Sequence, residues 1–274
     1  AMKRIGHYAG VIFIMFWGLA PFYWMLVTAL RDKRHTFDTT PWPTHVTLEN
    51  FNDALATDKG NNFLGAIGNS LIISLTTTVL AVLVGVFTAY ALTRLDFPGK
   101  GIITGVILAA SMFPGIALVT PLFQLFGDLG WIGTYRAMII PNISFALPLT
   151  VYTLISFFQQ LPWELEEAAR VDGATRGQAF RLVLLPLAAP AIFTTAIIAF
   201  ITTWNEFMLA RQLSTTATEP VTVAIARFSG PSAFEYPYAA IMAAGSLVTV
   251  PLIIMVLIFQ RRIVDGLTAG GVKG

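Results

Sequence analysis

Six long apolar stretches alternate with polar segments along the chain. None of the six contains Lys, Arg, Asp or Glu, and each reaches the ~20 residues that a helix needs to cross the hydrocarbon core of a bilayer. The stretches are Tyr8–Leu30, Phe63–Thr93, Gly101–Gly127, Ala137–Gln160, Leu187–Asn205 and Tyr238–Phe259. No alternating barrel pattern is present, and backbone groups in lipid must bond within their own segment. We therefore predict an all-α, polytopic membrane protein with six transmembrane helices in one domain, residues 1–274.

The composition supports a membrane setting and narrows the chemistry. Hydrophobic residues make up 55% of the 274 residues and charged residues only 12%, against the roughly 25% charged that is usual in soluble domains. The absence of cysteine excludes disulfides, thiol catalysis and cysteine metal sites. The three histidines lack metal-ligand spacing and no Ser/His/Asp arrangement is recognisable, so we expect no catalytic, metal or cofactor-binding site. The net charge of +2 comes without a basic cluster of the kind that binds nucleic acid.

The flanking charges bear on how the chain enters the membrane. Lys3 and Arg4 precede the first apolar stretch, which could therefore be a signal peptide. It is too long for one and no small-residue cleavage site follows, which favours a retained helix. The basic residues between the stretches favour both termini in the cytoplasm, although Arg31, Lys33 and Arg34 oppose this locally.

Residues 31–62 form the longest soluble segment, on the outside in this orientation. Thr47 begins a helix-start signal that predicts a short helix through Leu55. The segment could rim an outer mouth, meet a soluble partner, or be a plain connector.

The polar segment 161–186 separates the fourth and fifth apolar stretches and predicts two short helices. Pro162 suits the first position of the first helix. Three glutamates place negative charge where the helix dipole favours it: Glu164, Glu166 and Glu167. Gly173 suits a left-handed C-terminal cap, which ends this helix.

The second helix starts at once. Thr175 and Gln178 have capping-box spacing, and an apolar face follows before Pro186 marks re-entry into the membrane. That face consists of Phe180, Val183 and Leu184.

Two interpretations of this hairpin remain open on spacing alone. Ala168 and Ala169 leave a smooth patch beside the Gly173 bend, which would let the backbone of another protein approach closely. The same caps would equally serve a solvated hairpin without a partner, because capping is ordinary helix chemistry.

The spacing of this segment also resembles a known family. Glu167–Ala169, Gly173 and Val183–Pro186 match the EAA loop of bacterial ABC importer permeases, departing only by Val for the usual Ile. Further matching segments are Asn69-Ser70, Ala89–Arg94, Phe97–Lys100, Trp204–Phe207 and Gly266–Gly274. With these the chain resembles the carbohydrate branch of the family from roughly its first helix to its last residue, and it is most similar to the permeases of mycobacterial trehalose importers.

The resemblance implies a non-catalytic permease subunit in the bacterial cytoplasmic membrane. Such a subunit forms half of the pathway for a di- or oligosaccharide of the trehalose or maltose type. Its implied partners are a second homologous permease, two cytoplasmic ATPases, an extracytoplasmic sugar-binding protein, the carbohydrate and the lipid bilayer, with no nucleic acid. ATP and Mg would be bound by the partners, which agrees with the lack of any G-x-x-x-x-G-K-[ST] phosphate loop in this chain.

The resemblance also assigns two ATPase contacts. Residues of the coupling loop, 161–186, that would dock on the ATPase are Glu166, Glu167, Ala168, Ala169, Arg170, Asp172, Gly173, Arg176 and Pro186. The cytoplasmic tail, 261–274, would reach between the two ATPases through Gly266, Thr268, Gly270, Gly271 and Lys273. On composition alone the tail after Asp265 has too little apolar content to fold by itself, which favours a frayed end.

Polar residues near the membrane suggest a sugar pathway. Polar side chains are costly in lipid and usually face a bundle interior or a cavity. Asn205 and Glu206 could bond sugar hydroxyls and Trp204 could stack on a sugar ring, but such residues also often only bond neighbouring helices or anchor an interface. The candidates are Asn69, Asn142, Trp204, Asn205 and Glu206. Prolines that could kink the apolar helices include Pro114, Pro141, Pro148 and Pro251.

Two other classes of protein stay open from the residues alone. An ion-coupled secondary sugar transporter would place its substrate groups in broken midplane helices and would need no ATPase-docking loop. A membrane-embedded enzyme would need convergent acid, base or metal residues inside the bilayer, and these are scarce here.

Overall fold

The chain is helical throughout the part that the structure describes. The structure is a computed structural model that describes the backbone of residues 2–57, 62–228 and 236–271, and side chains from residue 6 to residue 260 within those ranges. Within them, the extended pairing is a single bridge between Arg31 and Val46. The predicted all-α class is confirmed.

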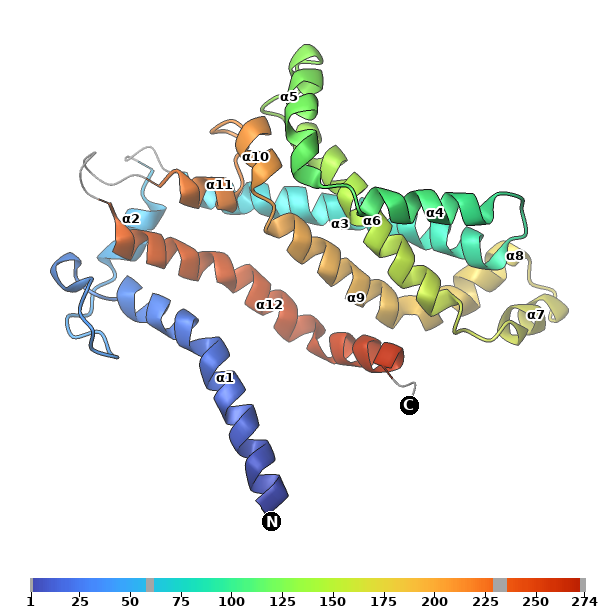
Figure 1. The fold of residues 1–274 in the computed structure, drawn as a ribbon, viewed down its shortest axis with the longest axis horizontal. Coiled ribbons are helices and arrows are strands. Elements are labelled where there is room, and N and C mark those ends of the chain that lie inside the picture. The colour runs from blue at the N-terminus through green and yellow to red at the C-terminus, as the bar shows by residue number, and fades with distance from the viewer. Residues whose placement is uncertain (1, 58–61, 229–235, 272–274) are drawn as a thin grey trace. The chain divides into compact units, whose positions relative to one another are not determined.

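The elements follow one another as short connecting helices between long ones (Figure 1). In chain order they are α1 (Met2–Ala29), η1 (Lys33–His35), α2 (Glu49–Leu55), α3 (Phe63–Arg94), α4 (Lys100–Ser111), η2 (Gly115–Leu118), α5 (Val119–Asp128), α6 (Tyr135–Phe158), α7 (Glu164–Val171), α8 (Arg176–Ala179), η3 (Phe180–Leu184), α9 (Leu185–Trp204), α10 (Met208–Leu213), α11 (Val221–Ala226) and α12 (Tyr238–Gly271).

Five helices in the described part are long and apolar enough to cross a membrane, and a bent pair brings the number to six. The bent pair is the predicted span Gly101–Gly127, where α4 and the stretch Gly115–Asp128 meet at 87°. A span that Pro114 could kink was expected here, and the structure divides it into two helices at this proline. Pro114 has extended backbone angles and cannot donate the backbone hydrogen bond that would continue α4, so the kink expected at this proline becomes a break.

The chain divides into two compact units whose boundaries fall inside helices. Unit 1 comprises residues 1–67 and 223–254, and unit 2 comprises residues 68–222 and 255–274.

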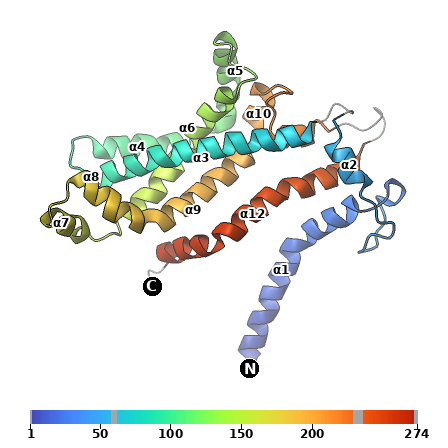
Figure 2. The same cartoon turned by 180° about the vertical axis from the view of Figure 1, so that it is seen from behind.

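In unit 2, helices α3, α4, α6 and α9 lie side by side, and α5 turns away from α4 (Figures 1 and 2). One buried cluster joins α3, the end of α6, η3 and the start of α9. Its members are Val86, Ala89, Leu154, Phe158, Phe180, Leu184, Ala188 and Ala191. Small residues let these helices approach closely: a Cβ added at Gly85 would lie 2.5 Å from the Cγ2 atom of Thr150. Close packing of this kind holds membrane helices together where no hydrophobic effect acts between them.

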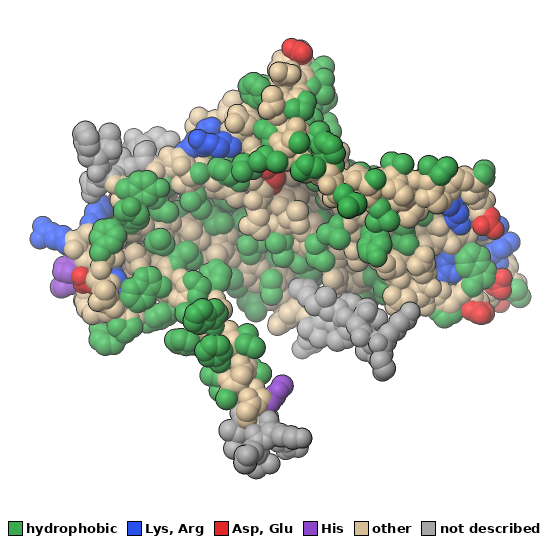
Figure 3. All heavy atoms as spheres, viewed as in Figure 1, with side chains coloured by type: hydrophobic (Ala, Val, Ile, Leu, Met, Phe, Trp, Pro, Cys, Tyr) green, Lys and Arg blue, Asp and Glu red, His purple; other side chains and the backbone are tan. Residues whose placement is uncertain are grey.

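The outward faces of the long helices remain apolar. Exposed side chains on α3 and α4 include Leu75, Val79, Ile102 and Val106. Figure 3 shows hydrophobic side chains along these helices, whereas charged side chains gather over α7 and α8. Exposed apolar surface on this scale fits contact with lipid or with another membrane protein.

In unit 1, buried polar groups order the segment after α1. The Arg31 side chain donates hydrogen bonds to the backbone carbonyls of Asp38 and Thr40. Asn50 donates to the carbonyl oxygens of Ala29 at 2.9 Å and Arg31 at 2.6 Å. Buried polar groups need such partners, so α2 is tied to the end of α1.

A surface ion pair supports the same helix. Lys33 Nζ lies 2.8 Å from Asp53 Oδ2 and 3.2 Å from Glu49 Oε1, and the hydrogen bond to Asp53 raises the pKa of Lys33. The short helix predicted to run through Leu55 is confirmed, although it begins at Glu49.

The last helix extends further than expected. α12 continues to Gly271, although residues after Asp265 were expected to be too poor in apolar groups to fold alone. Extending an existing helix avoids the cost of nucleating a new one, which is the physical reason for the difference.

Candidate coupling loop and polar cluster

The candidate coupling loop, residues 161–186, contains two short helices joined by a sharp turn. α7 spans Glu164–Val171 and α8 spans Arg176–Ala179. Gly173 has a φ of +91°, and the N–H of Ala174 donates to the carbonyl of Ala169 at 3.0 Å. The predicted left-handed glycine cap is therefore confirmed.

The capping box of the second helix is also confirmed. Thr175 Oγ1 accepts from the N–H of Gln178 at 3.3 Å, and Gln178 Oε1 accepts from the N–H of Thr175 at 2.8 Å. The expected place of Pro162 is wrong, because Trp163 is the N-cap of α7 and Pro162 precedes it. The three glutamates do lie in the first turn of α7.

The junction with the membrane helix is a π-helical segment, η3. The N–H of Leu185 donates to the carbonyl of Phe180, five residues earlier. Pro186 lies one residue further on and has no N–H to continue regular α-helical bonding. Single π turns inside helices occur frequently at functional sites.

Most of the residues expected at the ATPase contact are exposed. The exposed ones are Glu167, Ala168, Arg170, Asp172, Gly173, Arg176 and Pro186, and Ala169 is half-buried. A Cβ added at Gly173 would meet nothing within 4 Å. The turn therefore presents a small, open patch flanked by charges of both signs.

Glu166 differs from the others because it points inward. Only 6% of the residue is exposed, and its Oε1 atom accepts a hydrogen bond of 3.1 Å from the hydroxyl of Tyr90 on α3. One turn further along α3, Arg94 donates to the carbonyls of Phe158 and Leu161 at 3.0 and 2.7 Å. The segment Ala89–Arg94 resembles the family in sequence, but no role was predicted for Tyr90 or Arg94, although their four-residue spacing places both side chains on one face.

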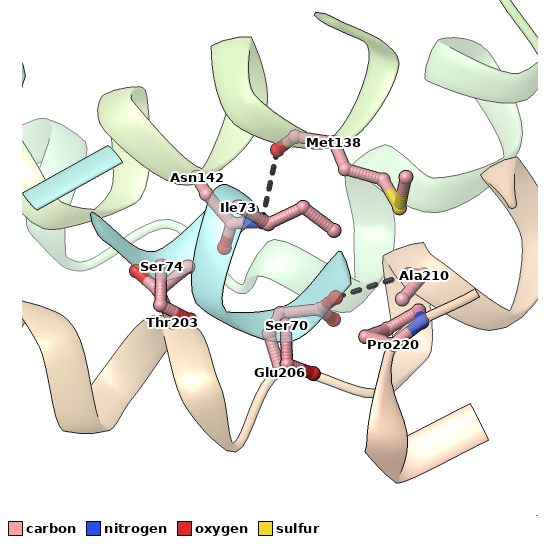
Figure 4. A pocket seen from close by; sticks show the side chains of 9 residues that line it. All are labelled: Ser70, Ile73, Ser74, Met138, Asn142, Thr203, Glu206, Ala210 and Pro220. Atoms are coloured by element: carbon pink, nitrogen blue, oxygen red, sulfur yellow. Dashed lines mark hydrogen bonds between the residues drawn. The ribbon is translucent and has the colours of Figure 1, made fainter. Parts of the chain in front are cut away.

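Two of the candidate sugar-pathway residues, Asn142 and Glu206, line a small polar pocket in unit 2 (Figure 4). The other three, Asn69, Trp204 and Asn205, do not line it. The other residues of its wall are Ser70, Ile73, Ser74, Met138, Thr203, Ala210 and Pro220. Its volume is about 10 Å³, far below the ~300 Å³ at which ordinary small-molecule pockets begin. It is too small to enclose a disaccharide within this chain.

Asn69 and Asn142 mainly bond to backbone. Asn69 donates to the carbonyls of Ala217 and Glu219 at 3.1 and 3.0 Å and accepts from the Tyr135 hydroxyl at 2.6 Å. Asn142 donates to the carbonyl of Met138 at 2.9 Å. The bonds of Asn69 hold the segment before α11 against α3, and that of Asn142 stays within α6.

Glu206 acts as a helix cap. Its carboxylate accepts hydrogen bonds of 2.8 and 3.0 Å from the N–H groups of Leu209 and Ala210. Burial raises the pKa of the Glu206 carboxyl, and these backbone donors oppose the rise.

The remaining two candidates differ in exposure. Trp204 is 1% exposed and stacks on Phe200 with ring centroids 5.5 Å apart. Its Nε1 is buried with no hydrogen-bond partner in the described residues. Asn205 is exposed and donates to the carbonyl of Ile201 at 2.9 Å.

The predictions for the tail and for metal sites can be compared only with the part of the chain that the structure describes. Lys273 lies outside it, as do the side chains of Gly266, Thr268, Gly270 and Gly271. Among the described residues there is no group of three or more His, Cys, Asp or Glu that could hold a metal ion.

The fold and the exposed, capped loop define the class of a multi-pass membrane transport subunit. The family model described as "binding-protein-dependent transport system inner membrane component" matches residues 81–268, and the chain belongs to this family. It is the inner-membrane permease of an ABC importer that works with a binding protein and partner subunits. Permeases of this family are non-catalytic and bind no cofactor, because ATP is bound by ATPase partners.

Relatives match along nearly the whole chain. The trehalose transport system permease protein SugB of Mycobacterium tuberculosis is 47% identical over 259 residues, covering 94% of this chain and 93% of the relative. The trehalose/maltose transport system permease protein MalG of Thermococcus litoralis is 41% identical over 275 residues, covering 100% and 98%. A solved bacterial ABC transporter involved in the import of the acidic polysaccharide alginate shares the fold, with a TM-score of 0.78, 20% identity and coverage of 95% and 97%.

Proposed function

We propose that the chain is one of two permease subunits in an ATP-driven importer of a di- or oligosaccharide of the trehalose or maltose type. The substrate class is inferred from the 47% identity, over nearly the full length, with a relative named for trehalose transport. The relative named for trehalose and maltose supports the same class. The finer assembly consists of a second homologous permease, two cytoplasmic ATPases and an extracytoplasmic sugar-binding protein.

The coupling loop is the ATPase contact in this proposal, and it faces the cytoplasm together with both termini. Support comes from its open Gly173 turn, from the exposure of its small and charged residues, and from its caps, which hold the turn without help from a partner. When ATP closes the ATPase dimer, the loop moves with it and the permease pair changes from inward-facing to outward-facing. The tail residues from 266 onward supply a second contact with the same ATPases.

The sugar pathway lies between the two permeases rather than inside this chain. The small volume of the polar pocket supports this, as does the use of Asn69 and Glu206 in bonds to backbone. Asn205 is the candidate that stays exposed for sugar contact.

Uptake of labelled sugar by the complete reconstituted complex, with its binding protein present, tests the function. We expect ATP-dependent uptake of trehalose or maltose into liposomes. Absence of uptake for both sugars, in a complex that hydrolyses ATP when other sugars are supplied, would reject the substrate class.

A further inference from the structure

The end of α3 contacts both ends of the coupling loop. Tyr90 and Arg94 are four residues apart and so project from one face of the helix. Tyr90 reaches Glu166 in the first turn of α7. The Arg94 guanidinium lies 4.7 Å from the ring centroid of Trp163, the N-cap of α7. Two attachment points one turn apart fix the orientation of α7 as well as its position.

Arg94 also holds the end of α6. Its two acceptors are the carbonyl of Phe158, the last residue of α6, and the carbonyl of Leu161, three residues later. The last carbonyls of a helix have no partner within that helix. Arg94 is 7% exposed, and a buried cation requires such acceptors. The same side chain therefore joins α3, the end of α6 and the start of α7.

The aromatic ring of Tyr90 extends the attachment to the far end of the loop. Its centroid lies 4.5 Å from that of Phe180 in η3 and 6.4 Å from that of Phe158 in α6. Phe158 and Phe180 belong to the buried cluster that packs α3 against α6 and α9. Both ends of the coupling loop are thus fixed to one turn of α3.

We propose that Tyr90 and Arg94, here called the α3 clamp, are positioning residues that make the coupling loop and the ends of α3 and α6 move as one body. The inference rests on the proposed function, because it requires the ATPase to move the loop. The clamp transmits that movement directly to two membrane helices. Without the α3 clamp, the coupling loop moves with the ATPase while α3 and α6 do not.

The first test measures sugar imported per ATP hydrolysed in the complete reconstituted complex. Tyr90→Phe removes the hydroxyl bound to Glu166, and Arg94→Lys removes the forked donor. We expect each to lower the ratio by about fivefold or more, the scale of a typical coupling interaction, while the ATPases still co-purify.

Tyr152→Phe is the matched control. Tyr152 lies on α6 with 53% of the residue exposed. The substitution Tyr152→Phe removes the same hydroxyl group as Tyr90→Phe. Its ratio should equal that of the unaltered complex. A purely structural role would change the amount of assembled complex and leave the ratio unchanged, so unchanged ratios in Tyr90→Phe and Arg94→Lys would overturn the proposal.

A cross-link provides a test that leaves the clamp intact. Thr93 and Gln160 border the same surface hollow beside Arg94, and the chain contains no cysteine. We expect Thr93→Cys with Gln160→Cys to react with a short bifunctional thiol reagent and to retain uptake afterwards, because the two positions do not separate. Loss of uptake on cross-linking, or failure to cross-link, counts against one-body movement.

The two proposals fail in different ways. A complex without any ATP-dependent sugar uptake would remove the proposed function. Normal uptake with unchanged ratios in the clamp variants would remove the clamp alone.

Discussion

At the scale of single residues, substitutions of Gly173 separate two effects, which are strain in the backbone of the turn and loss of contact with the ATPase. Its φ of +91° disfavours most side chains, although a Cβ would meet open space. Asn tolerates the left-handed region, whereas Val would strain this turn by at least ~1–2 kcal/mol. We therefore expect Gly173→Val to lose ATPase co-purification and sugar uptake more severely than Gly173→Asn.

Comparing Gly173→Val with Gly173→Asn also shows whether the turn requires a left-handed backbone or the absence of any side chain. If Gly173→Asn is as defective as Gly173→Val while thermal unfolding stays normal, the ATPase needs the missing side chain itself. Normal uptake in both variants would show that the turn has no part in docking.

Glu206 provides a second residue-scale prediction. Removing its cap in Glu206→Ala should destabilise the protein by about 1 kcal/mol, measured by thermal unfolding of the purified chain. Glu206→Gln keeps an acceptor and should leave the KM for sugar unchanged. A large change of KM with normal thermal stability would instead make Glu206 a sugar contact.

The same variants test the direction in which the stability of the protein changes with pH. Burial raises the folded pKa of Glu206 above its ordinary value of 4.5. Its contribution to stability is then fully present below pH 4.5 and decreases as the pH rises through the folded pKa. Glu206→Gln should remove this decrease.

At the scale of elements, η3 sets the rotation of α8 relative to α9. Pro186 lacks the N–H that regular α-helical bonding would use, and the π turn precedes it. Pro186→Ala should allow a continuous α-helix, stabilise the junction by up to ~3 kcal/mol, and turn α8 by about 100°, one residue of helix. The expected outcome is a higher unfolding temperature with less sugar imported per ATP.

Pro190→Ala is the matched control for this prediction. Pro190 lies inside the regular part of α9, so the same chemical change there should leave the imported sugar per ATP unaltered. Equal ratios for Pro186→Ala and the unaltered complex would mean that the π turn is unrelated to coupling.

At the scale of the whole molecule, the predictable features are those fixed by nearby residues. Apolar length located the five long helices of the described part and the bent pair, and short-range chemistry located the Gly173 cap and the Thr175–Gln178 box. The bond from Tyr90 to Glu166 joins positions 76 apart, and no periodicity reveals which helices pack together. For the same reason, sequence alone made Asn69 a pathway candidate, whereas its acceptors lie about 150 positions away in the chain.

The size of the polar pocket and the lack of a phosphate-binding loop lead to a prediction for the chain on its own. Its polar pocket is below the size of a sugar site, and it has no phosphate-binding loop. A chain that supplies only half of the proposed pathway and has no energy source of its own should not concentrate sugar. We expect liposomes containing this chain alone to accumulate no labelled trehalose on proton or sodium gradients, whereas the full complex accumulates it with ATP. Accumulation by the chain alone would restore the ion-coupled mechanism, because the pathway would then need no second permease.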